Sequence, residues 1–279
     1  MGTVLLTGAT GFVGRQVLRE LRRRGAAVRV AVRDGSQHRL EDREGLHSVV
    51  TTPDLFGEPA SWWASACAGM DTVVHAAWYA EPGQYLGSPK NIDCLAGTLR
   101  LAQGAAAAGA RRIVGVGTCF EYEVSAVPLS THAPLRPQTP YAGAKAAAFL
   151  ALSQNLPPLG VSFAWCRLFY LYGEGEDPRR LVPQLRSRLQ AGQPVDLTRG
   201  DQVRDYMDVA DAARMIVDTT LSGVEGAVNV CSGVPVTIRA LAERIAAEYG
   251  RADLLRFGAR PDNPFDPPHI VGIPGQQGA

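Results

Sequence analysis

Short apolar runs rich in valine and isoleucine alternate, over the first 172 residues, with longer amphipathic segments rich in alanine, leucine and arginine. Such short runs are typical of strands buried on both faces of a sheet, and the longer segments are typical of helices. The pattern predicts strands at Thr3–Thr7, Ala27–Val32, Ser48–Thr51, Thr72–His75, Arg112–Gly117 and Ser162–Leu168 and helices at Phe12–Arg24, Ala60–Ala68, Pro89–Ala108 and Pro140–Leu156. This order predicts an α/β fold with a doubly wound parallel sheet.

The pattern changes after residue 172, where glycine, proline and charged residues interrupt the periodicity. Helices are predicted at Leu181–Ala191, Ala210–Leu221 and Ile238–Tyr249 and a strand at Ala227–Val230, and the chain after Phe257 is rich in proline and glycine. We therefore expect a large unit over residues 1–172 and a smaller α/β region over residues 173–279. The smaller region is expected to pack on the edge of the sheet and not to fold alone.

Composition and charge argue against several classes of protein. A hydrophobic fraction of 46% with 20% charged residues is typical of a folded chain, and a formal net charge of +1 provides no field that would attract nucleic acid or an anionic membrane. The first residues read as a strand rather than as a signal peptide, so we expect a soluble, cytoplasmic protein. The five cysteines are scattered, without a C-x-x-C pair or metal-ligand spacing, which predicts reduced thiols and no metal site.

A glycine-rich turn joins the first predicted strand to the first predicted helix. Glycines here permit a tight turn, a close approach of the backbone to a ligand, and close packing of the helix on the strand. The amide groups at the start of the helix favour an anion. The spacing G-x-x-G-x-x-G, without the Lys-Ser/Thr of a kinase-type phosphate loop, predicts a site for the pyrophosphate of NAD or NADP, formed by Gly8, Thr10, Gly11, Phe12, Val13 and Gly14.

The end of the second strand distinguishes these two cofactors. An acidic residue there would bind the ribose hydroxyls and repel a 2′-phosphate, whereas an arginine would bind the phosphate. Arg33 ends the strand and Asp34 follows it. We favour NADP on this ground; the alternative is that Asp34 binds the ribose of NAD and that Arg33 is a solvated surface residue.

Three side chains are candidates for acid–base chemistry. Tyr141 and Lys145 lie four residues apart at the start of a predicted helix and therefore share one of its faces. The ammonium group, together with the positive nicotinamide, would lower the pKa of the Tyr141 phenol, which could exchange a proton with a substrate oxygen during hydride transfer. Thr118 ends the fifth strand, where parallel sheets gather their ligands, and is placed to bind the same oxygen.

These motifs resemble the extended short-chain dehydrogenase/reductase family, the branch of nucleotide-sugar epimerases, dehydratases and 4-ketoreductases. The resemblance covers nearly the whole chain to Asp262 and implies a Rossmann-like dinucleotide-binding domain over residues 1–172. The matching segments are Gly8–Gly14, Asp54-Leu55, Asp71–Ala77, Asn91, Tyr141 with Lys145, Arg167–Gly173 and Arg204–Asp211. The resemblance implies that the cofactor is contacted at the adenine by Asp54 and Leu55 and elsewhere by Ala76, Ala77, Tyr141, Lys145 and Leu168, and that Asn91 tethers the central strands beside it.

The resemblance also narrows the reaction. Dehydratases of the family carry an acidic pair directly after the threonine, whereas Cys119, interpreted as a packing residue, and Phe120 stand here, which disfavours dehydration. Since Arg33 favours an exchangeable NADPH, we expect reduction of the 4-keto group of a nucleotide-activated deoxysugar, with Tyr141 as proton donor. Epimerisation at C4 with bound NAD needs the same residues and stays open. A non-catalytic dinucleotide-binding regulator is the alternative from another class, although such proteins usually lack the tyrosine and lysine.

Substrate contacts are expected from several parts of the chain. The resemblance places Arg204 and Arg260 near the nucleotide diphosphate, and Tyr170 stands where many relatives carry an asparagine that contacts it. The further candidates for substrate binding are Trp78, Tyr79, Thr118 and Glu121. Relatives commonly dimerise through the helices that correspond to Pro89–Ala108 and Pro140–Leu156, which predicts a homodimer.

Overall fold

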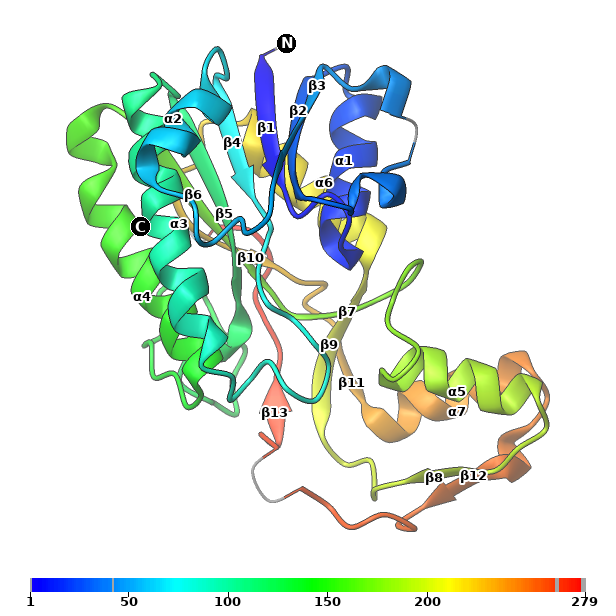
Figure 1. The fold of residues 1–279 in the computed structure, drawn as a ribbon. Coiled ribbons are helices and arrows are strands. Elements are labelled where there is room, and N and C mark those ends of the chain that lie inside the picture. Colours follow the sequence, from blue (N-terminus) through cyan, green and yellow to red (C-terminus); the bar gives the residue numbers. More distant parts are fainter. Residues whose placement is uncertain (1, 42, 264–265, 277–279) are drawn as a thin grey trace.

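The computed structural model describes residues 2–41, 43–263 and 266–276. Its centre is a seven-stranded sheet in the order β10-β6-β5-β4-β1-β2-β3, in which every neighbouring pair is parallel (Figure 1). The strands are β1 Thr3–Thr7, β2 Ala27–Arg33, β3 Ser48–Thr52, β4 Thr72–His75, β5 Arg112–Thr118, β6 Ser162–Leu168 and β10 Gly226–Val230. The predicted doubly wound parallel sheet is confirmed, and its order reverses between β1 and β4, the point at which such sheets bind ligands.

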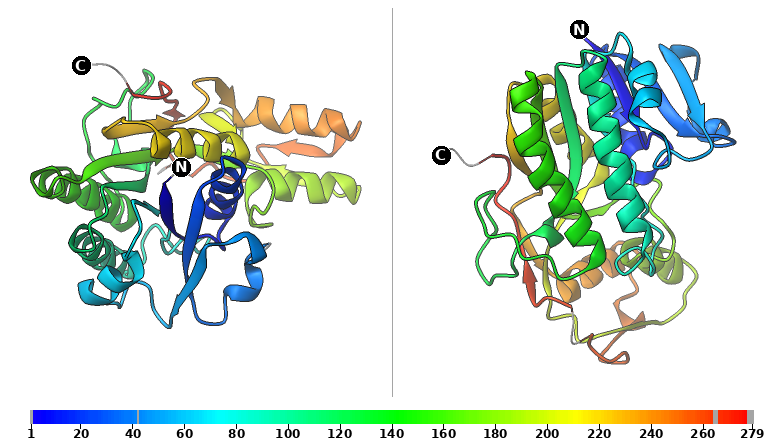
Figure 2. Two further views of the ribbon diagram at one scale, coloured as in Figure 1. Left: turned by 90° about the horizontal axis from the view of Figure 1, so that it is seen from above. Right: turned by 60° about the vertical axis from the view of Figure 1, so that its left-hand side comes forward.

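Helices cover both faces of this sheet (Figure 2). One face carries α1 Phe12–Arg23 and α6 Val209–Leu221, and the other carries α2 Ala60–Cys67, α3 Lys90–Ala107 and α4 Pro140–Asn155. Alternate residues of a strand point to opposite faces, so Val4 and Leu6 of β1 pack under α1 and α6, whereas Leu5 packs under α2 and α3. Burial on both faces explains the continuous apolar runs of the sequence.

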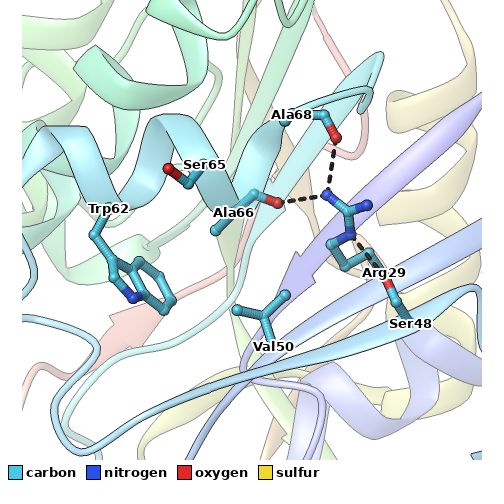
Figure 3. Close-up of a pocket in the computed structure, with 7 residues that line it drawn as sticks. All are labelled: Arg29, Ser48, Val50, Trp62, Ser65, Ala66 and Ala68. Atoms are coloured by element: carbon cyan, nitrogen blue, oxygen red, sulfur yellow. Dashed lines mark hydrogen bonds between the residues drawn. The ribbon is translucent and has the colours of Figure 1, made fainter.

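A cavity of about 390 Å³ lies between β2, β3 and the end of α2 (Figure 3). Its lining residues are Arg29, Ser48, Val50, Trp62, Ser65, Ala66 and Ala68. Arg29 donates hydrogen bonds to the Ser48 hydroxyl at 2.8 Å and to the carbonyl oxygen of Ala66 at 2.8 Å, which holds the last turn of α2 against the sheet. The cavity lies beside the amino-terminal halves of the two strands, away from the edge where the predicted site residues gather.

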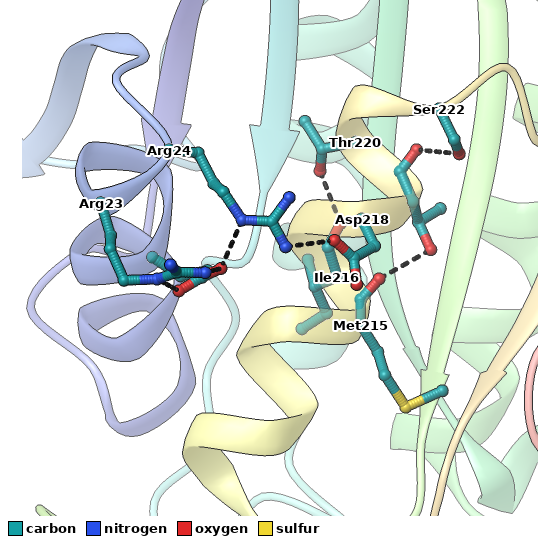
Figure 4. Close-up of polar contacts among 9 residues, drawn as sticks. Arg23, Arg24, Met215, Ile216, Asp218, Thr220 and Ser222 are labelled. Atoms are coloured by element: carbon teal, nitrogen blue, oxygen red, sulfur yellow. Dashed lines mark hydrogen bonds and ion pairs between the residues drawn. The ribbon is translucent and has the colours of Figure 1, made fainter.

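A cluster of charged side chains at the end of α1 makes one ion pair to α6, on the other face of the sheet. The Glu20 carboxylate accepts hydrogen bonds from Nε of Arg23 at 2.6 Å and Nε of Arg24 at 2.9 Å, and Arg24 also donates to Asp218 on α6 at 2.5 Å (Figure 4). Cations at the end of α1 favour the negative end of its dipole. The pair between the helices is partly exposed and therefore screened by solvent, so apolar contacts such as those of the buried Ile216 hold α6 in place.

The smaller region lies below the carboxyl ends of the central strands in Figure 1. It contains α5 Leu181–Gln190 packed on α7 Ile238–Glu248, a small sheet of β7 Tyr170–Tyr172, β9 Val203–Asp208, β11 Pro235–Thr237 and β13 His269–Ile270, and the pair β8 Val195–Leu197 with β12 Leu255–Phe257. Five 3-10 turns complete the described elements, namely η1 Gln37–Arg39, η2 Arg43–Gly45, η3 Cys119–Glu121, η4 Pro157–Leu159 and η5 Ala252–Leu254.

Two segments after residue 172 return to the large unit. Strand β10 pairs with β6 along five residues and extends the central sheet, and α6 packs on α1. Both carry buried apolar residues that match the face they cover, such as Val230 of β10 and Ile216 of α6. The chain after residue 172 therefore contributes to both units, and no single cut there separates the units.

Strands β5 and β6 bring polar groups into the core beneath α4. Trp165 and Arg167 of β6 stand opposite Gly115 and Gly117 of β5. A Cβ atom at Gly115 would lie 2.3 Å from the Trp165 ring, so glycine provides the space that the indole occupies. This placement brings Nε1 of Trp165 within 2.9 Å of the Glu121 carboxylate.

Glu121 is the centre of a buried polar cluster. Its side chain has no exposed surface, and it accepts a hydrogen bond at 2.7 Å from Nε of Arg167, which is 1% exposed. The backbone N–H of Thr118 donates to the same carboxylate at 2.8 Å, and Arg167 also donates to the Tyr122 hydroxyl at 2.9 Å. A buried charge is tolerated only when it is paired and hydrogen-bonded, so these partners fix the end of β5.

Replacement of Gly115 by alanine should lower the free energy of unfolding by about 1–3 kcal/mol, because the added methyl group would overlap the Trp165 ring. Urea denaturation followed by circular dichroism measures this change. The control is Gly143→Ala in α4, where no heavy atom lies within 4 Å of the added Cβ and alanine favours the helix. A Gly115→Ala variant as stable as the control variant would contradict this account of the packing.

Replacement of Glu121 by glutamine should lower the free energy of unfolding by about 3–5 kcal/mol, because the Arg167 charge would remain buried without a counter-charge. The same denaturation experiment measures the loss. Glu123→Gln is the matched control two residues away, since its pair with Arg136 is exposed and is worth at most about 1 kcal/mol. Equal stabilities of the two variants would show that the buried pair is not the stronger interaction.

Candidate active site

The glycine loop packs directly against the end of β4. Gly8 has φ of +78°, and a Cβ atom there would lie 2.7 Å from the main chain of Ala76. A Cβ atom at Gly14 would lie 2.1 Å from the carbonyl oxygen of Gly8, so α1 sits closely on the turn. Ala77, which is buried, donates its N–H to the Thr7 hydroxyl at 3.2 Å. The loop is therefore held at the switch point of the sheet.

The start of α1 fits an anionic ligand. Gly11 caps this helix without a side-chain hydrogen bond, and the first turn, which includes Phe12 and Val13, holds no acidic residue. Helix amides without an internal partner are a suitable site for phosphate oxygens. These residues therefore fit the pyrophosphate of a dinucleotide.

The end of β2 carries more positive charge than the sequence analysis predicted. Arg33 and Asp34 are both exposed at the carboxyl end of β2, as expected. Arg39 of η1, which was not predicted, donates a hydrogen bond to the Thr10 carbonyl oxygen at 3.0 Å and therefore lies against the glycine loop. The position of Arg39 in the loop that follows Arg33 could have identified it as a candidate from the sequence.

The predicted adenine contacts follow β3. Asp54 is exposed, and its carboxylate accepts a hydrogen bond from the N–H of Phe56 at 3.0 Å. Leu55 is buried in the core under α2. Both lie at the same edge of the sheet as the glycine loop, and Leu168, half-buried at the end of β6, lies there too.

Thr118 and Tyr141 are brought together. Thr139 caps α4 by accepting a hydrogen bond from the N–H of Ala142 at 3.2 Å, which places Tyr141 in the first turn. The Thr118 side chain lowers the pKa of the Tyr141 phenol, but burial raises that pKa by more, to well above its ordinary value. The expected lowering of the Tyr141 pKa is therefore not observed in the chain itself, because loss of solvent dominates.

Lys145 lies one turn further along α4 and is 3% exposed. Its Nζ atom donates to the Val116 carbonyl oxygen at 2.5 Å and lies 3.8 Å from the centre of the Trp78 ring. Burial lowers the pKa of Lys145 to about 7, and the nearby Glu121 carboxylate opposes this change. The amine is therefore poised to gain or lose a proton near neutral pH.

Asn91 is buried, but its bonds differ from those expected. It accepts a hydrogen bond from Nε1 of Trp78 at 2.8 Å and donates to the Tyr85 carbonyl oxygen at 2.7 Å, so it ties the loop after β4 rather than the central strands. The reason is its place in the first turn of α3, next to that loop. Cys94, one turn later on α3, also binds the loop after β4, because its Sγ atom accepts a hydrogen bond from the N–H of Tyr79 at 3.4 Å.

His75 is a packing residue. Its ring is buried and hydrogen-bonds the hydroxyls of Thr7 at 2.8 Å and Thr98 at 2.9 Å. Burial lowers its pKa to about 3, so the ring is neutral.

The predicted substrate contacts Glu121, Arg204 and Arg260 lie in different surroundings. Glu121 is excluded as a direct contact, because its carboxylate is fully buried behind Thr118. Arg204 is 2% exposed, donates to Asp266 at 2.6 Å and lies 5.2 Å from the Tyr170 ring. Arg260 is exposed in the bend after β12 and donates its N–H to the Leu197 carbonyl oxygen of β8 at 3.0 Å, away from the small sheet that contains Arg204.

Two loops meet beside Tyr141, and the sequence analysis did not predict this contact. The Tyr85 ring lies edge-on to the Tyr141 ring at 4.9 Å, and the Arg180 guanidinium lies 5.4 Å from the Tyr85 ring. An ion pair of 2.8 Å between Arg179 and Glu81 joins the same two loops. No local signal could have shown the contact, since the loops are far apart in the sequence.

Glu176 is a further ionisable group of the loop between β7 and α5, which also carries Arg179 and Arg180. Its Oε2 atom is buried without a hydrogen-bond partner among the described residues. Burial raises the pKa of Glu176 to about 7.

In the described ranges, no three histidine, cysteine or acidic side chains gather as a metal site. No helix of the described chain is long and apolar enough to cross a membrane.

Comparisons with known proteins agree with this arrangement. Residues 4–231 match the model of the NAD dependent epimerase/dehydratase family. The chain is 24% identical over 278 residues to a dTDP-6-deoxy-L-talose 4-dehydrogenase (NAD(+)) of Aggregatibacter actinomycetemcomitans, covering 96% of this chain and 98% of that protein. It is 29% identical over 287 residues to a UDP-glucose 4-epimerase of Mycolicibacterium smegmatis, covering 95% and 86%.

A solved structure gives the same picture. The complex of Thermus thermophilus UDP-glucose 4-epimerase with NAD superposes with a TM-score of 0.79 at 26% identity, covering 98% of this chain and 90% of that one. The family model spans the glycine loop, Thr118, Tyr141 and Lys145. The chain therefore belongs to the NAD dependent epimerase/dehydratase family, the extended branch of the short-chain dehydrogenases/reductases that its motifs resemble.

Proposed function

We propose that this chain is an oxidoreductase that reduces the 4-keto group of a nucleotide-activated deoxysugar by hydride transfer from NADPH. The placement of Thr118 at the end of β5 and of Tyr141 in the first turn of α4, at the sheet edge that also holds the glycine loop, carries this proposal. The family membership supports a dinucleotide cofactor. The 4-dehydrogenase among the relatives is named for a redox reaction at C4, which supports net reduction or oxidation, and the UDP-glucose 4-epimerase among them keeps epimerisation as the alternative.

The residues of this chain would bind the substrate oxygen and supply its proton. The dinucleotide, when bound, supplies the hydride. The Thr118 hydroxyl and the Tyr141 phenol would both hydrogen-bond the carbonyl oxygen, and Tyr141 would donate its proton as the alcohol forms. A phenol whose pKa is raised by burial stays protonated near neutral pH, which suits a proton donor. Lys145, with a pKa of about 7, would return a proton to Tyr141.

Dehydration is disfavoured by the residues after Thr118. Cys119 is buried and its pKa is raised to about 12, so the thiol is inert as an acid or base. Phe120 has no ionisable group, and Glu121 is committed to its pair with Arg167. No acid–base pair follows the threonine.

Replacement of Tyr141 by phenylalanine should lower kcat by about 10²–10⁴-fold, because the proton donor is lost. The dissociation constant for NADPH should change little. The measurement is the oxidation of NADPH that depends on added dTDP-4-keto-6-deoxysugar. Tyr249→Phe at the end of α7 is the control and should keep full activity.

An active Tyr141→Phe enzyme would contradict the proposed mechanism. A parent chain that binds the dinucleotide but oxidises none of it with any ketosugar would instead support the non-catalytic regulator. Interconversion of two sugars without net oxidation of the cofactor would support the 4-epimerase.

Replacement of Arg33 by serine should weaken the binding of NADP by at least about tenfold and leave the binding of NAD nearly unchanged, because only NADP carries the 2′-phosphate that a charged hydrogen bond would stabilise. Thermal shift titrations with both cofactors measure this. Arg111→Ser is the control, since Arg111 pairs with Asp71 before the start of β5. A parent chain that prefers NAD, the cofactor named for the talose dehydrogenase, would overturn the proposal and favour Asp34 as the ribose ligand.

We also propose a homodimer formed through α3 and α4. These helices carry exposed apolar side chains, with Ile92 65% exposed and Leu150 54% exposed, which a second copy would cover. Light scattering should give the mass of a dimer for the parent chain and that of a monomer for Leu150→Arg. A monomeric parent chain at micromolar concentration would reject the dimer.

A further inference from the structure

Two side chains from separate elements meet behind Tyr141. Trp78 follows β4, and the Nζ atom of Lys145 on α4 lies 3.8 Å from the centre of its indole ring. A cation over the face of an indole is attracted by the electrons of the ring, most strongly where both are removed from water. Lys145 is 3% exposed and Trp78 is half-buried, so the ammonium group meets this condition and the indole meets it in part.

A buried amide fixes the indole. Asn91 has no exposed surface and accepts a hydrogen bond from Nε1 of Trp78 at 2.8 Å. The same side chain donates to the Tyr85 carbonyl oxygen at 2.7 Å. The rings of Trp78 and Tyr85 both lie edge-on to Tyr141, at 6.4 and 4.9 Å. Asn91 therefore anchors both residues whose rings flank Tyr141. One of these residues, Trp78, also provides the ring beneath Lys145.

We propose that Trp78 is a positioning residue: the face of its indole ring, held by Asn91, seats the ammonium group of Lys145 beside Tyr141. This proposal rests on the role proposed above for Lys145. It gives Trp78 a role besides the substrate contact expected of it, because the ammonium covers one face of the ring. Val116 accepts one of the three ammonium hydrogens, so donors remain for a hydroxyl group of a ligand.

The ionisable groups that act on Lys145 or are influenced by it come from η3, α3 and β4, and Tyr141 lies one turn before it on α4. Glu121 of η3 and Cys94 of α3 both raise its pKa. His75 at the end of β4 is neutral, and Tyr141 on α4 is protonated, so neither competes for the charge. The indole adds to the stabilisation of the ammonium form. Loss of the aromatic face should therefore favour the neutral amine.

The sequence makes a direct test simple, because it contains two lysines, Lys90 and Lys145. Lysine labelled with an NMR-active isotope at the side-chain carbon gives one signal for each, with the exposed Lys90 as internal reference and Lys90→Arg for the assignment. The titration is carried out on the cofactor-free chain with Trp78→Phe and Trp78→Leu. Both variants lose the indole N–H, but only phenylalanine keeps an aromatic face.

We expect the titration midpoint of Lys145 in Trp78→Leu to lie about one pH unit below that in Trp78→Phe, which is a tenfold change in the protonation equilibrium. Equal midpoints would overturn the proposal. If Trp78→Leu does not fold, Trp78→Met, which is closer to tryptophan in length, takes its place in the same comparison. Asn91→Ala, which frees the indole, should lower the midpoint relative to the parent chain, and an unchanged midpoint would refute the part assigned to Asn91.

The pH dependence of turnover provides a second measurement. Since the ammonium form is the active one, kcat should fall as the pH rises through the pKa of Lys145, and it should fall at lower pH in Trp78→Leu than in Trp78→Phe. A role in folding alone would leave these profiles in the same place. The NMR titration does not depend on enzymatic activity. A chain that is inactive on ketosugars but shows the expected difference in the Lys145 midpoint would therefore reject the proposed function and still support the positioning role of Trp78.

Discussion

The buried ion pair between Glu121 and Arg167 is the interaction on which the arrangement of the site depends. A carboxylate without exposed surface is stable only because Arg167, the indole N–H of Trp165 and the backbone N–H of Thr118 all bind it. These partners are present because β5 provides glycines where β6 provides the large side chains. The cluster fixes the backbone of Thr118 and places a negative charge near Lys145.

Burial gives the two ionisable residues of α4 complementary properties. Loss of solvent raises the pKa of the Tyr141 phenol and lowers that of the Lys145 ammonium, because each change favours the neutral form. The protonated phenol can donate to a carbonyl oxygen, and the amine can exchange a proton near neutral pH. A site of this kind suits the reduction of a ketone, whereas water elimination would need a second acid–base pair.

Much of this arrangement follows from local features of the sequence. Strand and helix patterns predict the parallel sheet, and because parallel strands end at one edge, the glycine loop, Thr118 and Tyr141 are predicted to meet there. The burial of Glu121 could not be predicted, since its partners Trp165 and Arg167 lie 44 and 46 residues away and their register depends on the paired strands.

Other features were missed for the same reason. The apolar pattern of β10 predicts a strand but does not say which sheet it joins. The family resemblance implied that Asn91 tethers the central strands, whereas its observed bonds to the loop of Trp78 and Tyr85 depend on where α3 begins. The contact between Tyr85 and Arg180 depends on the packing of two loops, and the sequence of neither loop contains a pattern that predicts it.

The transfer of deuterium to the sugar tests the central claim most directly. The chain is incubated with dTDP-4-keto-6-deoxysugar and NADPH deuterated at the transferable position of the nicotinamide, and the product is analysed by mass spectrometry and NMR. We expect a dTDP-6-deoxysugar that carries a hydroxyl group and deuterium at C4, with an equal amount of oxidised cofactor. Recovery of the sugar, changed or unchanged, without deuterium at C4 would contradict the claim.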